Sequence, residues 1–576
     1  MVAPKNIAWL AWSKETFEKA KQENKPILLS ISAVWCHWCH IMDETTFSTP
    51  EVSQLINQNF IPIRVDTDER PEINERYNMG GWPTVVLLTS QGAPIQGTTY
   101  LPKDSFISFL QESLAIYGSQ KEILNKNYSE NLQERIQTKS VFVLPSLDVL
   151  QSIQLFSSNV RNSFDLENFG FGSAPKFPHT PLLKFLYFNQ LHSKNPEYLK
   201  FFIQTLQKMA QSELFDKEAG GFFRYSMQAD WAQPHFEKMS EDHAELLDLY
   251  CFAFLETNQT FFKQIIEKTV NFILTEWQDS KTKAFSASTD ADEHYYSLSL
   301  SERKKHPHPF IDQRHFTDWN SLLVSSLLLA SEILEKPELK ENALQTLDYL
   351  LFHHFQNNQV FHFNSPQAPV HLLSDYAFLL KACLDAYSFS FNSKYLDQAK
   401  ALLDLIVEKF YSDSEKAFLD ISKNFQDFGE LNHKTVSFKE NAVLITCLNK
   451  LAFLLQKSEY ETKAVDLSKR FLSQSLSENL MAASLFSALY IIKNGLTEVK
   501  LVGSFKDPET QKMLSILRKH SNNSLVFEFI ENSDKSKLAL FSLPETLTQT
   551  QAIVCKKKVC LTPVKIAVEL EKILKE

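Results

Sequence analysis

The sequence predicts a multidomain protein in which an α/β domain is followed by a closed array of helical hairpins and then by a small α/β segment. Three observations indicate this division. Short apolar runs alternate with helical patterns over residues 1–130. Long amphipathic helices without convincing parallel strands fill residues 145–495, and an α/β pattern returns over residues 496–576. A chain of 576 residues is also too long for one ordinary domain.

The first region alternates helices and strands in the order of a thioredoxin-like sheet that is covered on both faces. The expected helices span residues 13–22, 36–46, 51–59, 73–77 and 104–124, and the expected strands span residues 26–32, 60–66, 84–89 and 95–100. A pair of cysteines follows the first of these strands, which is where a thioredoxin-like sheet carries its redox site.

Cys36 and Cys39 end the first expected strand and open the next expected helix. One helical turn brings the two sulfurs within bonding reach, and the free N–H groups at the helix start favour a thiolate at the first cysteine. His37 between them can donate a hydrogen bond or carry positive charge, and either stabilises that thiolate. The pattern predicts thiol–disulfide exchange, with an accessible Cys36 as the attacking thiolate and Cys39 as the resolving thiol.

Pro83 stands directly before the apolar strand at residues 84–89. The sequence predicts a cis bond between Trp82 and Pro83 that faces the cysteines, because proline is the residue for which a cis bond is cheap. Pro83 would align an extended partner chain, and Trp38 would supply an apolar platform. The predicted catalytic residues are Cys36, His37, Trp38, Cys39 and Pro83.

Other chemistries use the same residues. Cys-x-x-Cys-His is the attachment pattern of c-type haem, but haem attachment needs an export route and an axial partner region, and the sequence indicates neither. Ligation of zinc or copper by Cys36, His37, Cys39 and His40 is disfavoured because adjacent residues rarely reach one tetrahedral ion together. We therefore predict no cofactor and no metal, and a buried cysteine pair without chemistry is the remaining alternative.

The middle region is predicted to hold twelve helices whose connections alternate between short and long. The long connections span residues 162–179, 215–239, 278–317, 356–370 and 412–437. In an antiparallel array every second connection emerges at the same end, so these loops are expected to share one rim where a site is built. Each long loop repeats a polar turn followed by a short aromatic strand, which indicates an (α/α)6 toroid, with an open helical-repeat scaffold as the alternative.

Aromatic, basic and acidic side chains recur in these long loops and at the helix starts that follow them. Such a mixture suits a sugar or polyol, because stacking and bidentate hydrogen bonds complement ring faces and hydroxyl groups. Asp318 and Asp375 are interpreted as helix N-caps rather than as catalytic groups. The predicted substrate-binding residues are Lys176, Arg224, Tyr225, Trp231, His235, Glu237, Asp242, Asp290, Asp292 and Trp319. Seven of them are expected to line one concave pocket: Arg224, Tyr225, His235, Glu237, Asp290, Asp292 and Trp319.

The remaining cysteines do not make a disulfide framework. Cys251, Cys383 and Cys447 lie in helical apolar patterns and are expected to be buried packing residues. Cys555 and Cys560 have four residues between them, a spacing that is wrong for a helical C-x-x-C pair. A second redox pair, a metal role and two simple thiols all stay open for this pair.

Net charge and hydropathy exclude several functions. A formal charge of −10 argues against a general binder of nucleic acid or of anionic membranes. The sequence contains no run of eighteen apolar residues, so no membrane span is predicted. The first twenty residues lack the apolar region of a secretory signal, and we therefore expect a cytoplasmic location.

Several motifs resemble those of the spermatogenesis-associated protein 20 family, and the resemblance spans nearly the whole chain. The motifs are Cys36-His37-Trp38-Cys39-His40, Asp66-Thr67-Asp68-Glu69-Arg70-Pro71, Gly80-Gly81-Trp82-Pro83, Ala174-Pro175-Lys176-Phe177-Pro178-His179, Gly220-Gly221-Phe222-Phe223-Arg224-Tyr225-Ser226, Pro234-His235-Phe236-Glu237-Lys238-Met239, Asp290-Ala291-Asp292, Asp318-Trp319-Asn320 and Asp375-Tyr376-Ala377. The resemblance implies a thioredoxin-like N-terminal domain joined to a six-hairpin toroid similar to glycosidases and sugar epimerases. This chain departs from the family at Val34-Trp35, where the family usually has small polar residues.

The predicted function is a thiol–disulfide oxidoreductase of the thioredoxin-like type, whose glycosidase- or epimerase-like toroid binds an unidentified substrate or partner. The predicted partners are a disulfide-containing protein or a small thiol, and a sugar-like small molecule at the toroid rim, without nucleic acid or membrane. One alternative is a carbohydrate-active enzyme, a hydrolase or epimerase, with a regulatory redox domain. The other alternative is a non-catalytic interaction scaffold.

Overall fold

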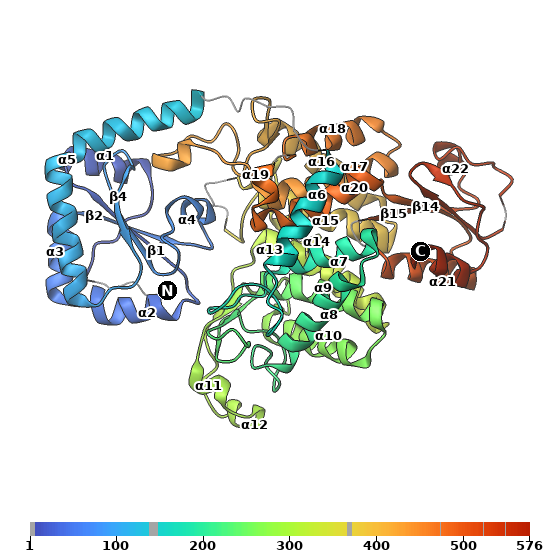
Figure 1. Cartoon of the computed structure of the whole chain (residues 1–576), viewed down its shortest axis with the longest axis horizontal. Helices are drawn as coiled ribbons and strands as arrows, with labels where there is room; N and C mark the ends of the chain where they lie inside the picture. Colours follow the sequence, from blue (N-terminus) through green and yellow to red (C-terminus); the bar gives the residue numbers. More distant parts are fainter. Residues whose placement is uncertain are drawn as a thin grey trace.

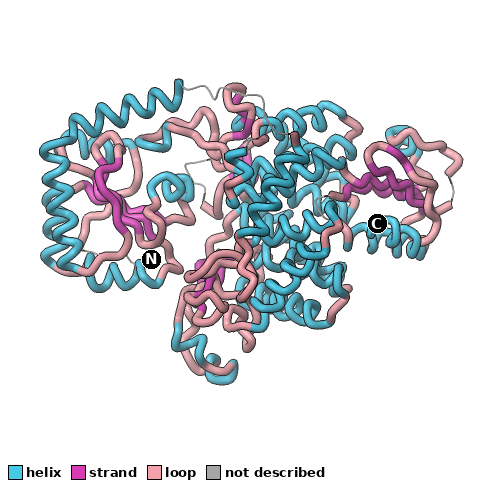
Figure 2. Tube along the Cα trace, viewed as in Figure 1, coloured by secondary structure: helices cyan, strands magenta, loops and turns pink. Residues whose placement is uncertain are grey.

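The computed structural model describes residues 6–137, 148–365, 371–472, 474–521, 524–547 and 549–575. Three parts follow one another along the long axis of the molecule, from the N-terminal α/β part through a large helical part to the C-terminal α/β part (Figure 1). The two largest sheets lie at opposite ends, with the helices between them (Figure 2). Within the described ranges, no helix is both long and apolar enough to cross a membrane.

The N-terminal sheet has four strands in the order β2-β1-β3-β4. The central strand β1 (Ile27–Ser32) pairs in parallel with β2 (Ile61–Asp66) and antiparallel with β3 (Thr84–Leu88), and β4 (Pro94–Thr98) is the edge strand. Every residue of β1 is buried, as its uninterrupted apolar run predicts.

Helices cover both faces of this sheet because alternate residues of β1 point to opposite sides. Residues of α1 (Lys14–Glu23) and α4 (Pro71–Tyr77) pack with Leu29 on one face. Residues of α3 (Pro50–Asn59) and α5 (Lys103–Gln137) pack with Leu28 on the other. The predicted thioredoxin-like arrangement is confirmed, although α5 continues beyond residue 130, where the sequence predicted the first domain to end.

Six inner helices form a closed ring in which each helix packs against the next and the last packs against the first. They are α7 (Thr180–Ser193), α9 (Ser240–Thr257), α13 (Thr317–Leu334), α15 (Leu373–Ser390), α17 (Phe438–Leu454) and α20 (Ala483–Asn494). Ring closure confirms the (α/α)6 toroid and removes the open scaffold as an alternative architecture.

Six outer helices alternate with the inner ones along the chain. They are α6 (Val149–Asn162), α8 (Pro196–Gln211), α10 (Thr260–Phe272), α14 (Pro337–His353), α16 (Ser393–Phe410) and α18 (Ser458–Lys469). The outer helix α16 buries one stripe of residues, whereas the inner helix α13 is buried along nearly its whole circumference. This difference is what two concentric layers of helices require.

The long loops carry short strands on the side of the ring that faces the N-terminal part. One loop pairs β5 (Tyr225–Ser226) with β6 (Pro234–His235). A three-stranded sheet joins two loops through β7 (Lys238–Met239), β8 (Ser288–Thr289) and β9 (Ile311–Asp312). Two further loops carry the pairs β10 (Phe355–Gln356) with β11 (Gln359–Val360) and β12 (Tyr411–Ser412) with β13 (Ala417–Phe418).

Charged contacts attach the N-terminal part to this rim. Arg76 Nη2 lies 2.8 Å from Asp420 Oδ2. Arg314 reaches back from the toroid to Asp66 at 3.2 Å and to Glu69 at 2.8 Å. The redox region and the toroid rim therefore face each other across a shared surface.

The C-terminal part is a four-stranded sheet of order β15-β14-β16-β17 with helices beside it. Its strands are β14 (Thr497–Gly503), β15 (Leu525–Glu531), β16 (Gln551–Lys556) and β17 (Val559–Cys560), and its helices are α21 (Pro508–Lys519), α22 (Lys535–Leu540) and α23 (Ala567–Lys575). Cys555 and Cys560 are paired across β16 and β17 and form a disulfide. Cys251, Cys383 and Cys447 are buried free thiols, as predicted.

Candidate functional site

The cysteine pair lies where the sequence predicts it, at the start of α2 (His37–Met42). Cys36 is the N-cap residue, its Sγ accepts a hydrogen bond from the backbone N–H of Cys39 at 3.1 Å, and the two cysteines form a disulfide. The first turn of α2 contains no acidic side chain, so the helix start is free to favour a thiolate. The predicted cis bond between Trp82 and Pro83 is also confirmed.

The toroid covers this pair. Cys36 is 4% exposed and Cys39 is 1% exposed, and Met239 of β7 belongs to the buried cluster that contains both. The prediction of an accessible Cys36 is therefore wrong, because the pair is buried in a cluster to which the toroid contributes Met239, 203 positions later in the chain. No local pattern around Met239 distinguishes it from an ordinary core methionine, so sequence reasoning missed it.

Arg224 joins the two parts beside the cysteines. Its guanidinium lies 4.1 Å from the ring centroid of Trp35 and 5.0 Å from that of Trp82. Trp35 in turn donates from its Nε1 to Asp68 Oδ2 at 2.8 Å. A cation–π contact of this kind is worth more where water is excluded, so Arg224 stabilises the docking of the rim on the redox region.

The two histidines of the redox motif meet a second group of rim residues. His40 Nδ1 lies 3.5 Å from Asp290 Oδ2, and the ring of His37 lies 6.4 Å from the ring of His235. His235 Nδ1 forms a hydrogen bond with Glu237 Oε2 at 2.5 Å, and Tyr225 stacks on His235 with ring centroids 4.9 Å apart. Burial raises the pKa of Asp290 to about 6, against the opposing effect of His40.

A cavity of about 340 Å³ lies between the N-terminal part and the centre of the ring. The redox side contributes Trp35 and Trp82, and the toroid contributes Arg224, Met239 and Trp319. Eight carboxylate residues also line the cavity: Asp68, Glu72, Glu75, Glu241, Asp242, Asp318, Asp420 and Glu440. Met239 is shared, because it lines the cavity and belongs to the buried cluster of the cysteines.

The cavity carboxyls have raised pKa values. Burial raises the pKa of Asp68 to about 8, and Asp66 adds to this. Burial also raises the pKa of Asp242 to about 7, although Arg224 opposes the shift. Burial likewise raises the pKa values of Glu75 and Glu440 to about 7.

Asp318 and Asp375 are not helix caps, so that interpretation is wrong. The N-cap residues of α13 and α15 are Phe316 and Leu372. Asp318 lines the cavity, and burial followed by the charge of Asp375 raises its pKa to about 6. Asp375 is completely buried and pairs instead with His362.

The residues Asp318, His362 and Asp375 lie close enough together for a metal site. His362 uses both ring nitrogens, since Nδ1 contacts Asp375 at 3.0 Å and Nε2 donates to the backbone carbonyl of Asp68 at 2.8 Å. Burial disfavours the imidazolium, but Asp375 raises the pKa of His362 to about 10. The three side chains therefore form an internal network in which His362 is held between Asp375 and the backbone carbonyl of Asp68.

Of the seven rim residues that were expected to line one pocket, two line this cavity. Arg224 and Trp319 line the cavity, whereas Tyr225, His235, Glu237 and Asp290 gather beside the redox histidines. Asp292 instead caps the short helix α11 (Glu293–Ser297). Asp242, which sequence analysis also selected, does line the cavity.

Lys176 and Trp231 lie outside both groups. Lys176 is fully buried, with its Nζ 2.6 Å from Asp165 Oδ2 and 5.1 Å from the ring centroid of Trp231. The indole of Trp231 donates to the carbonyl of Asn168. Both side chains thus stabilise the rim from within, and the predicted role in binding substrate receives no support from their position.

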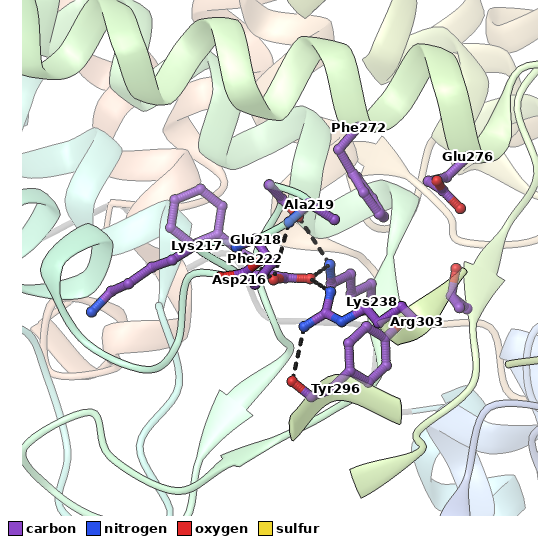
Figure 3. Close-up of polar contacts among 12 residues, drawn as sticks. Asp216, Lys217, Glu218, Ala219, Phe222, Lys238, Phe272, Glu276, Tyr296 and Arg303 are labelled. Atoms are coloured by element: carbon purple, nitrogen blue, oxygen red, sulfur yellow. Dashed lines mark hydrogen bonds and ion pairs between the residues drawn. The ribbon is translucent and has the colours of Figure 1, made fainter. Parts of the chain in front are cut away.

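Lys238 anchors the strand that carries Met239 (Figure 3). Its Nζ lies 2.8 Å from Asp216 Oδ2 and 2.9 Å from the carbonyl of Gly220, and Arg303 contacts the same carboxylate at 2.7 Å. The aromatic rings of Phe223, Phe272 and Tyr296 surround the ammonium group at 4.2–5.1 Å. Two rim loops are thereby tied together directly beneath the redox site.

Comparisons with known proteins agree with this description. The family model Thioredox_DsbH, described as a protein of unknown function (DUF255), matches residues 1–137. Spermatogenesis-associated protein 20 of Homo sapiens is 24% identical, over 99% of this chain and 90% of that protein. The thiol:disulfide interchange protein DsbD of Campylobacter jejuni is 29% identical over 103 residues, which is 16% of this chain and 18% of that protein.

Among solved structures, cellobiose 2-epimerase from Bacillus thermoamylovorans B4167 matches with a TM-score of 0.48 and 10% identity, over 60% of this chain and 99% of that chain. The motifs, the ring closure and the sequence matches agree with one another. The chain is thus similar to spermatogenesis-associated protein 20 along nearly its whole length, and it has a thioredoxin-like N-terminal domain of redox type joined to an (α/α)6 toroid.

Proposed function

We propose that the chain is a cytoplasmic thiol–disulfide oxidoreductase that reacts through Cys36 and Cys39. The observation that carries the proposal is the pair itself, at a helix N-terminus with a backbone N–H donated to Cys36 Sγ. The Thioredox_DsbH match and the similarity to DsbD support the same chemistry. His37, Trp38 and Pro83 complete the proposed site.

In the proposed reaction, the Cys36 thiolate attacks one sulfur of a substrate disulfide and releases the other half as a thiolate, which takes up a proton. The Cys39 thiolate then attacks Cys36 Sγ, which releases the second thiol and closes the Cys36–Cys39 disulfide. Two electrons pass from the dithiol to the substrate. An external dithiol reduces the enzyme again.

The burial of the cysteine pair beside Met239 favours small disulfides over folded proteins as substrates, because a large partner must first displace the toroid rim. Trp38 is the exposed part of the motif, with 47% of its surface accessible, and it offers an apolar approach to the pair. A disulfide in an extended or small molecule is therefore the proposed substrate.

The test measures reduction of 2-hydroxyethyl disulfide with dithiothreitol as the electron donor. Cys36→Ser should abolish turnover, and Cys39→Ser should accumulate a mixed disulfide on Cys36 that mass spectrometry detects. Cys560→Ser, which removes the other disulfide, is the matched control and should keep the rate. Unchanged turnover in Cys36→Ser would refute the proposal.

A carbohydrate-active enzyme with a regulatory redox domain is the second candidate. The observation in its favour is that Asp242 and Asp318, whose pKa values burial raises to about 7 and about 6, line the same cavity as Trp319. A carboxyl with such a pKa suits a general acid. Turnover of glycosides or epimerisation of free sugars that Asp242→Asn abolishes would support it, and a scaffold role would remain if neither activity is found.

A further inference from the structure

The cavity beside the redox site has more carboxylates than its cations neutralise. Against eight carboxylate residues, the lining contains the basic residues Arg224, His362 and Lys439, and two arginines outside the lining, Arg70 and Arg76, pair with Glu72 and Asp420. Each cation in the lining is already engaged: Arg224 stacks on Trp35, His362 pairs with Asp375, and Lys439 binds Glu241.

Two of these carboxylates have acceptor capacity left over. Glu72 is 2% exposed, and although its Oε1 contacts Arg70, its Oε2 has no hydrogen-bond partner in the described part of the chain. Asp242 forms no hydrogen bond or ion pair there either, and Arg224 acts on it only from a longer distance. A buried carboxylate oxygen without a donor is costly, so Glu72 favours a ligand that brings N–H groups, and the partly exposed carboxylate of Asp242 offers such a ligand a second acceptor.

The carboxylates also occupy the place where an anion would otherwise bind. Glu241 and Asp242 lie in the first turn of α9, Asp318 in that of α13 and Glu440 in that of α17. The positive ends of these inner helices are therefore already matched by negative side chains. The charge that remains for a ligand to supply is positive.

Aromatic surface completes the lining. Trp82, Trp319 and Phe378 contribute rings to the same walls. Indole faces attract ammonium groups and cover alkyl chains. A volume of about 340 Å³ accommodates a molecule of modest size.

We propose that this cavity binds a small aliphatic amine with one or two ammonium groups, which donate to Glu72 and Asp242 while the carbon chain lies against Trp319. Binding itself is independent of the redox proposal. Since Met239 lines the cavity and packs in the buried cluster that contains Cys36, an amine that carries a disulfide would approach the cysteine pair from the Met239 side of the cavity. That second part rests on the proposed function.

The binding test is calorimetric titration of the full chain with putrescine, and its matched ligand is 1,4-butanediol, which has the same carbon chain without charge. Putrescine should bind at least tenfold more tightly than the diol or than glucose. Asp242→Asn should lower the affinity for putrescine at least tenfold. If that variant does not fold, Asp318→Asn is measured in its place. Asp230→Asn, an exposed rim carboxylate outside the cavity, is the control and should leave the affinity unchanged.

Equal affinity for putrescine and the diol, or unchanged affinity in a folded Asp242→Asn variant, would overturn the proposal. Delivery of the amine to Cys36 is tested by comparing the kcat/KM of the protein for cystamine and for 2-hydroxyethyl disulfide. Each rate is corrected for the uncatalysed reaction of the disulfide with dithiothreitol. A tenfold higher kcat/KM for cystamine that Asp242→Asn removes would support delivery of the amine to Cys36. If putrescine binds and neither disulfide is reduced, the amine site stands and the proposed oxidoreductase fails.

Discussion

Two groups of buried charges lie within a few residues of each other on the rim, and they are built in opposite ways. Around Lys238, one carboxylate meets two cations, a carbonyl and three aromatic rings. Around the cavity, carboxylates outnumber the cations, and Glu72 and Asp242 have unused acceptors. The first group is internally satisfied and holds two loops in place, whereas the second keeps acceptors for which the described residues supply no donor.

The pKa values express the same contrast. Burial would raise the pKa of Asp216, but Lys238 and Arg303 hold it below its ordinary value. Burial raises the pKa of Asp242 to about 7, and the distant Arg224 does not cancel it. Buried charge alone therefore does not mark a ligand site. What marks one is buried charge without internal compensation.

The largest effect on stability is expected at Lys238. Lys238→Met removes a cation from a fully buried pair and leaves Asp216 undercompensated, which typically costs about 3–5 kcal/mol of unfolding free energy. Urea denaturation followed by circular dichroism measures the loss. Lys217→Met, at an exposed position of the same loop, should cost little. A loss for Lys238→Met no larger than that of the control would contradict the structural role of the cluster.

The cavity group predicts an unusual dependence of stability on pH. Glu75, Asp242 and Glu440 have folded pKa values of about 7 and Asp68 of about 8, whereas such carboxyls ionise near 4 in an unfolded chain. The folded state thus binds more protons at neutral pH, and its stability falls as the pH rises through these values. We expect a loss on the order of 2 kcal/mol between pH 7 and 8.5.

Urea titrations at several pH values measure this slope. Histidines with lowered pKa, such as His243 at about 3, oppose this trend only below the ordinary histidine range. His362, whose pKa is raised to about 10, also loses stabilisation as the pH rises above 7, so the share of the carboxyls is the part of the slope that Asp-to-Asn and Glu-to-Gln variants remove. Stability that stays flat or rises over this window would show that the carboxyls are compensated after all.

The variant Asp242→Asn tests the cost of one uncompensated carboxylate in the cavity. The amide cannot ionise, so the variant avoids the cost of charging this position and should be more stable than the parent at pH 8.5 by about 1–2 kcal/mol. The difference should shrink as the pH falls and vanish only below about pH 4, where the carboxyl is protonated in the folded and the unfolded state. Equal stability at both pH values would remove Asp242 from the uncompensated group.

Met239 links the two groups, and its truncation is expected to have the smallest energetic effect. Met239→Ala in the reduced protein should raise the rate of iodoacetamide labelling at Cys36 about tenfold, equivalent to about 1.4 kcal/mol in access. Peptide mapping by mass spectrometry measures the rate. Met227→Ala, at an exposed rim methionine, is the control, and equal rates in the two variants would mean that another residue closes the site.

Much of the fold follows from local pattern. The cysteine spacing predicts α2, and the alternation of short and long connections predicts a closed ring, since both depend on neighbours in sequence. The interpretation of Asp318 and Asp375 as N-caps failed because the N-cap positions of α13 and α15 are Phe316 and Leu372. The two aspartates lie inside the first turn of these helices instead.

The site was harder to predict because its chemistry depends on partners far along the chain. Lys176, Lys238 and Arg224 are alike in sequence, as basic residues in aromatic loops. Lys176 and Lys238 form ion pairs within the toroid, whereas Arg224 contacts Trp35 of the N-terminal part. The burial of Cys36 beside Met239 and the pairing of His362 with Asp375 left no local signal at all.

The tryptophans around the cysteine pair have an optical consequence. Trp82 and Trp319 pack against the cluster that holds Cys36 and Cys39, and Trp35 belongs to it. An excited indole passes an electron to a nearby disulfide and loses its emission, whereas a dithiol quenches it less. The oxidation state of this pair should therefore be visible as tryptophan brightness, so that each turnover can be followed by ultraviolet fluorescence without a label.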